Sequence, residues 1–206
     1  MIEIILLVSS VLFIFALKLF GRPSTAHRAN TFAMLAMALA VFSAFNFDFS
    51  KYDSAFYITI VVSGLLGVLI SKRVQMTQMP ELVGLFNGFG GGASGAIAYV
   101  ELSGNSLPLS DVFVAIFSMV IGVFTFSGSL VAVMKLRGKL NNFNKKLADI
   151  FSVFLPTIIV IPAVLEMDDL LIEFIILVAL IAGIIRVAVI GGADMPVVIA
   201  FLNSLS

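Results

Sequence analysis

The chain is divided into apolar stretches of about twenty residues, separated by short and more polar connections. About 20 apolar residues in a helix are enough to cross the ~30 Å hydrocarbon core of a bilayer. Hydrophobic residues make up 61% of the chain and charged residues only 12%, a balance that soluble domains do not show. The sequence therefore predicts an all-α fold, a polytopic membrane helix bundle. The predicted complete transmembrane helices cover 2–20, 30–48, 53–71, 81–102, 109–134, 149–166 and 169–190.

The start of an eighth transmembrane helix follows at Pro196 and reaches the end of the sequence at Ser206. At ~1.5 Å per residue this stretch rises only ~16 Å, less than a bilayer core. We therefore expect one transmembrane domain over residues 1–206 that ends within a helix. Because there is no cysteine, thiol ligands are excluded, and we expect no metal site.

The basic residues predict the orientation of the helices. Of the 12 Lys and Arg residues, all but Lys51 lie at or beside odd-numbered connections. By the positive-inside rule these connections are cytoplasmic and the amino terminus is outside. The expected location is the inner (plasma) membrane of the cell, with the chain embedded in the lipid bilayer.

Two of the apolar stretches share a polar pattern. Met79-Pro80 is followed by Asn87, and Met195-Pro196 is followed by Asn203, so that each Asn lies seven residues past its proline. All residues between the proline and the asparagine are apolar except Glu81. An amide is costly to place in hydrocarbon, and a matched pair indicates a functional role.

The depth of these amides is matched by hydroxyl groups on the stretch 109–134. The two asparagines lie ~10 Å into the membrane along a helix, and Ser129, six residues before Lys135, lies ~9 Å from the same face. Thr125 and Ser127 precede Ser129. These groups could line a hydrated path for a proton or small ion. Alternatively, they only join helices by hydrogen bonds worth ~0.6–2 kcal/mol each.

The glycine-rich stretch 88–93 satisfies the pattern G-x-G-x-x-[GA] of dinucleotide-binding loops. That motif requires a preceding strand and a βαβ unit, which the sequence does not predict here. Gly84, Gly88 and Gly92 instead recur every four residues and form a ridge that admits another helix backbone. We therefore assign these three glycines to helix packing, and expect a bulky residue at Gly88 or Gly92 to displace Asn87.

Asp194 directly precedes the second Met-Pro pair. It is a candidate N-cap residue, with Pro196 in the first turn of the helix. A carboxylate at the cytoplasmic mouth of a polar path could also exchange protons, and both interpretations remain open.

Three segments together resemble the membrane domain of the proton-translocating NAD(P) transhydrogenase beta subunit: MPELVGLFNGFGGGASG, FTFSGSLVAVMKLRGK and IGGADMPVVIAFLNS. The resemblance extends along nearly the whole chain, including helix order and loop charge. It implies hydride transfer from NADH to NADP⁺ coupled to inward proton movement. It also implies an alpha subunit as partner, a homodimer of the alpha–beta unit, and no nucleic acid. Position by position, Asn87, Ser129 and Asn203 match polar residues of the family's proton path, and Asp194 matches an acidic residue associated with coupling.

The chain departs from the family pattern in two respects. Some members have a histidine where this chain has Asn87, whose amide does not titrate at neutral pH. The family's NADP(H)-binding domain follows the membrane helices and is absent from this sequence. We therefore expect no catalytic residue and no bound cofactor in this chain, with NAD(H) and NADP(H) bound elsewhere in the complete enzyme. The alternatives are a standalone channel or transporter built from the same bundle and an inactive remnant of it.

Overall fold

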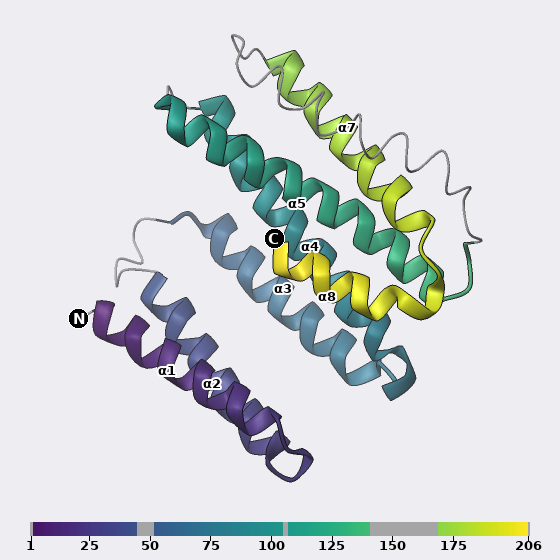
Figure 1. Ribbon diagram of the computed structural model, residues 1–206. Helices are drawn as coiled ribbons and strands as arrows, with labels where there is room; N and C mark the ends of the chain where they lie inside the picture. The colour runs from purple at the N-terminus through teal and green to yellow at the C-terminus, as the bar shows by residue number, and fades with distance from the viewer. Residues whose placement is uncertain (1, 45–51, 105–106, 141–168, 206) are drawn as a thin grey trace. The chain divides into compact units, whose positions relative to one another are not determined.

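The computed structural model describes residues 2–44, 52–104, 107–140 and 169–205, and all regular structure within them is helical (Figure 1). The all-α expectation is thus confirmed for this part of the chain. Four of these helices are long and apolar enough to span a membrane: Ile2–Phe20, Ser54–Arg73, Leu109–Leu136 and Leu170–Ala188. The number of complete spans stays a prediction, and the expected stretch 149–166 lies outside the described residues.

The first of two compact units, Met1–Lys72, contains a hairpin of α1 (Ile2–Phe20) and α2 (Ala26–Ala44). The two helices meet through small residues, and the Ser9 hydroxyl donates a hydrogen bond to the carbonyl of Ala36 at 2.7 Å. Helix α2 begins before the expected residue 30 because the turn η1 (Pro23–Thr25) continues directly into it. Helix α3 (Ser54–Arg73) follows and has no buried side chain.

The second unit, Arg73–Ser206, contains α4 (Met79–Gly104), α5 (Leu109–Leu136), α7 (Asp169–Ala188) and α8 (Met195–Leu205). In Figure 1, α5 and α7 run side by side, and α8 turns back from the end of α7. Two apolar cores hold the unit together. Near the start of α5 the buried side chains are Ala98, Ile116, Met119, Ile172, Ile175 and Val178. Near its end they are Val131, Ala132, Val187, Ala188, Met195, Ile199 and Leu202.

The repeated Met-Pro sequence corresponds to a repeated structure. The turn η3 (Met76–Gln78) leads directly into α4 at Met79, and the turn η5 (Gly192–Asp194) leads directly into α8 at Met195. Each proline is therefore the second residue of its helix, where a missing N–H costs nothing. Both helices begin at the end of the unit where α5 finishes. Glu81 near the start of α4 pairs with Arg137, and Gly192, just before α8, lies near Lys135, since a Cβ on it would be 3.5 Å from the Lys135 carbonyl oxygen.

Candidate functional site

A buried polar contact joins α4 to α5. The Asn87 side-chain nitrogen donates a hydrogen bond to the Ser129 hydroxyl oxygen at 2.9 Å. Asn87 is 8% exposed and Ser129 is completely buried. Sequence spacing placed these two side chains at one depth, and the structure brings them into direct contact.

Glycines beside Asn87 make this contact possible. A Cβ on Gly88 would be 3.2 Å from the Ser129 Cβ, so a larger residue there would push the two helices apart. A Cβ on Gly84 would be 2.8 Å from a Val133 methyl group, also on α5. A Cβ on Gly92 would be 3.1 Å from the ring of Phe126, and Gly92 is only half-buried. All three glycines of the predicted ridge therefore face α5, but the backbones of α4 and α5 do not come closest to each other at these glycines.

The closest approach of the two backbones lies at other glycines. A Cβ on Gly122 would be 2.5 Å from the carbonyl oxygen of Gly91 and 2.6 Å from the nitrogen of Gly95. Sequence reasoning missed these three residues because it followed a strict four-residue spacing. The face of α4 that meets α5 combines steps of three and four residues, through Gly84, Asn87, Gly91 and Gly95.

Thr125, Ser127 and Ser129, the hydroxyl residues in the second half of α5, have different environments. Ser129 pairs with Asn87. Thr125 lies one turn earlier against Gly91 on the same side, and its hydroxyl is buried without a hydrogen-bond partner among the described residues. Ser127 lies against Gly183 of α7 and donates to its own helix at the Phe124 carbonyl, 3.2 Å away. Only Ser129 and Thr125 thus belong to the interface with α4.

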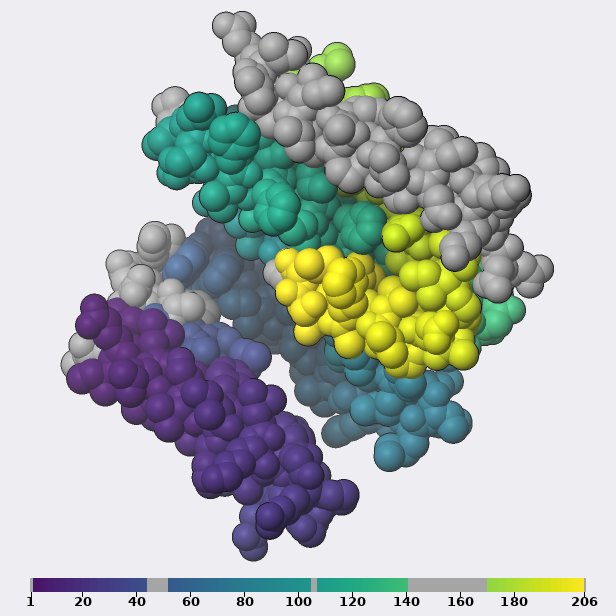
Figure 2. Space-filling model, in the orientation of Figure 1, coloured from purple at the N-terminus to yellow at the C-terminus, as the bar shows by residue number. Residues whose placement is uncertain are grey.

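The second asparagine of the repeat lies beside the first. Asn203 on α8 and Asn87 on α4 both line a groove of about 640 Å³, and the structure gives no hydrogen bond between them in the described part of the chain. The other lining residues are Val83, Phe86, Gly90, Pro196, Ile199 and Ala200. Asn203 is an exposed residue of α8, and helix α8 is seen at the surface in yellow in Figure 2. Asn87 and Asn203 therefore share one groove, while Ser129 is buried behind Asn87 and reaches the groove only through its hydrogen bond with that residue.

Asp194 is exposed at the end of η5. Its backbone N–H donates to the Gly191 carbonyl at 3.1 Å, and no backbone N–H of α8 donates to its carboxylate in the described residues. The expected capping bond is thus missing, because the 3₁₀ turn already satisfies the corner through backbone bonds. The carboxylate is left facing outward at the start of the helix that carries Asn203.

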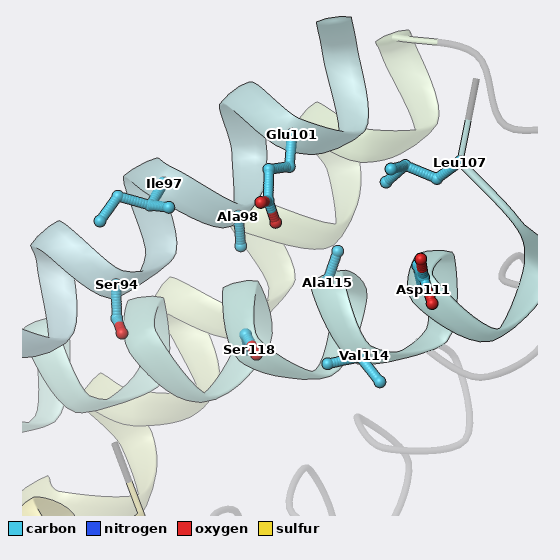
Figure 3. Close-up of a pocket in the computed structure, with 9 residues that line it drawn as sticks. All are labelled: Ser94, Ile97, Ala98, Glu101, Leu107, Asp111, Val114, Ala115 and Ser118. Atoms are coloured by element: carbon cyan, nitrogen blue, oxygen red, sulfur yellow. The ribbon is translucent and has the colours of Figure 1, made fainter. Parts of the chain in front are cut away.

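A second polar pocket lies at the opposite end of α4 and α5, and sequence analysis did not single it out. Its volume is about 410 Å³, and Figure 3 shows the Glu101 and Asp111 carboxylates on different sides of it. Ser94 and Ser118 also line it. Both acidic residues flank the connection between the two helices, and this position in the sequence could have predicted that they lie near each other. Along α5, the tight contact at Gly122 separates this pocket from Ser129.

The fold and the site define a helical membrane protein in which a buried polar contact joins α4 to α5, and a groove beside it also holds the amide of α8. Residues 2–206 match the family model of the NAD(P) transhydrogenase beta subunit. The chain therefore belongs to that family, and the resemblance of the three sequence segments is confirmed. Two curated relatives named NAD(P) transhydrogenase subunit beta, from Rhodospirillum rubrum and from a named strain of that species, are each 31% identical over 215 residues. The match covers 97% of this chain and 46% of each relative, so the chain spans about half the length of these proteins.

Proposed function

We propose that this chain forms the proton-translocating membrane part of a transhydrogenase. In the complete enzyme it couples hydride transfer between NADH and NADP⁺ to proton movement, along a path that includes Asn87, Ser129 and Asn203. The observation that carries this proposal is the 2.9 Å hydrogen bond between Asn87 and Ser129, beside a groove that also contains Asn203.

The chemistry of this pair suits the ordering of water. Because Asn87 donates through its nitrogen, its carbonyl oxygen stays available as an acceptor, and the Ser129 hydroxyl keeps its own proton to donate. Neither group changes its charge at neutral pH, so each orients water and neither stores a proton. A groove of about 640 Å³ is large enough for several waters, and Asn203 supplies a second amide along it.

The finer features of the proposal follow the family. Seven complete transmembrane helices and the start of an eighth cross the inner membrane, with the amino terminus outside and odd-numbered connections cytoplasmic. Asp194 couples the path to the nucleotide-binding part, supported by its exposed position at the start of α8. The partners are an alpha subunit, a second alpha–beta unit and the lipid bilayer.

The glycine-rich stretch of α4 does not fit a dinucleotide. A phosphate-binding loop needs open backbone N–H groups at the start of a helix. Here Gly88, Gly91 and Gly92 lie within α4, and their open faces are filled by Ser129, Thr125 and Phe126 of α5. This stretch therefore offers no support for a nucleotide site, and we propose that NAD(H) and NADP(H) bind outside this chain, without hydride transfer by the chain alone.

The experiment that tests this function compares two versions of the chain, each co-expressed with a cognate alpha subunit. One version is the chain as given, and the other continues into the remainder of a beta subunit. We would measure NADH-dependent reduction of an NADP⁺ analogue together with proton uptake into vesicles. Activity only in the longer version supports the proposal. Proton conductance by the chain alone, independent of nucleotides, would support the standalone channel instead. No activity in either version, with good membrane insertion, would leave the inactive remnant.

A further inference from the structure

A buried lysine connects the end of α5 to the end of α7. Lys135, in the last turn of α5, is only 6% exposed. Its ammonium group donates hydrogen bonds to the carbonyl of Ala188 and to the carbonyl of Ile190, the latter at 2.6 Å. Ala188 is the last residue of α7, and Ile190 belongs to the turn that leads into η5.

This arrangement satisfies a general requirement of helix ends. The last carbonyls of a helix have no partner within it and carry partial negative charge, so a cation beside them is stabilising. Water can meet this need at an exposed end. Here a charged side chain from a different helix meets it at a buried position, and a buried ammonium group is retained only where it is well paired. Lys135 therefore holds the corner between α7 and α8 in a defined place against α5.

The backbone of the same residue also lies close to the corner. A Cβ on Gly192 would be 3.5 Å from the carbonyl oxygen of Lys135. Gly192 is the first residue of η5, and Asp194 is its last. Ser129 lies on α5 six residues before Lys135, so one helix carries both the contact to Asn87 and the contact to the corner.

We infer that Lys135 is a positioning residue that keeps the α7–α8 corner, with Asp194 and α8, aligned with the Asn87–Ser129 contact. A displacement of the corner then moves α5, and the groove between Asn87 and Asn203 changes with it. This inference rests on the proposed function, because it assigns Lys135 to the coupling of the same path. Energetic coupling between separated sites travels through packed elements and hydrogen bonds of this kind.

The test uses a complete beta subunit carrying this sequence, assembled with its alpha subunit in vesicles. Lys135→Met removes both hydrogen bonds, whereas Lys135→Arg keeps a cation with several donors. Arg137→Gln is the matched control, because it also removes a positive charge from the end of α5. The Arg137 side chain donates a hydrogen bond to Glu81 rather than to the corner. Two quantities are measured: protons taken up per hydride transferred, and amide hydrogen exchange over residues 189–194.

We expect Lys135→Met to lose most of the proton uptake per hydride transferred, because the corner is then no longer held against α5. Exchange at the corner should rise, and Lys135→Arg should recover most of both quantities. Arg137→Gln should change neither. An unchanged ratio in Lys135→Met overturns the inference. If that variant does not assemble, Lys135→Gln takes its place, since its shorter amide keeps a donor without the charge: a lower ratio supports the inference, and an unchanged ratio overturns it. If the parent complex takes up no protons, the proposed function itself fails, and the exchange measurement alone then reports whether Lys135 holds the corner.

Discussion

The carbonyl oxygen of Gly91 lies 2.5 Å from the point that a Cβ on Gly122 would occupy. Two helices can meet this closely only where neither has a side chain, as in the small-residue interfaces of membrane helices. The contact fixes how α4 lies on α5, and therefore which side chains of α4 meet Ser129 and Thr125.

Two neighbouring glycines of α4 provide a direct test of this packing. A Cβ on Gly91 would be 2.7 Å from the Thr125 methyl group and 2.8 Å from the Gly122 carbonyl, whereas nothing lies within 4 Å of a Cβ on Gly90. We expect Gly91→Ala to destabilise the bundle by about 1–3 kcal/mol, since the backbone atom cannot move aside. Gly90→Ala should be neutral or stabilising, because alanine favours a helix by up to about 1 kcal/mol over glycine. Thermal unfolding in detergent measures both, and equal stability of the two variants would contradict the packing.

The sequence predicted much of the fold because apolar stretches and positions of proline and glycine are local signals. The helix starts expected near residue 81 and at Pro196 lie at Met79 and Met195, and the common depth predicted for Asn87 and Ser129 agrees with their hydrogen bond, although depth alone did not identify the pair. The capping of α7 by Lys135 was not predictable, because it joins residues more than fifty positions apart and depends on which helices are neighbours. The same holds for the orientation of Ser127 toward α7, since spacing along one helix does not identify the partner on each side.

Removing the hydroxyl group of Thr125 and removing that of Ser129 should change the stability of the bundle in opposite directions. Thr125→Val keeps the side-chain volume and removes a buried hydroxyl that has no partner among the described residues. Since an unsatisfied buried polar group costs about 1–3 kcal/mol, this variant should be as stable as the parent or more stable. Ser129→Ala removes the partner of Asn87 and should cost about 0.6–2 kcal/mol. Thermal unfolding of the two variants in one detergent decides the matter, and a clearly destabilised Thr125→Val would show that its hydroxyl has a partner.

The ion pair between Glu81 and Arg137 should contribute little to stability. The Arg137 Nε lies 2.7 Å from the Glu81 Oε2, and the side chains are 18% exposed for Glu81 and 46% for Arg137. Exposed pairs of this kind are worth at most about 1 kcal/mol and weaken as salt increases. Glu81→Gln should therefore lower the stability of the bundle only slightly, and the difference from the parent should shrink at high salt. Unfolding at low and high ionic strength measures this, and a large salt-independent loss would assign Glu81 another role.

Asn203→Asp should affect proton movement more than it affects folding. Helix α8 packs through Met195, Ile199 and Leu202 on its buried side, while Asn203 is on its exposed side and lines the groove shared with Asn87. The substitution keeps the shape of the side chain but places an ionisable carboxyl group in that groove, where it exchanges protons and attracts cations instead of only orienting water. Insertion and assembly should stay close to those of the parent. The neighbouring variant Ser204→Ala is the control, because within the described part of the chain the Ser204 hydroxyl donates to the Phe201 carbonyl of its own helix and to no other helix. Proton uptake is compared in vesicles that contain equal amounts of the complete enzyme. Slower uptake in Asn203→Asp than in Ser204→Ala supports a role of Asn203 in the path, and equal rates in Asn203→Asp and the parent remove Asn203 from it.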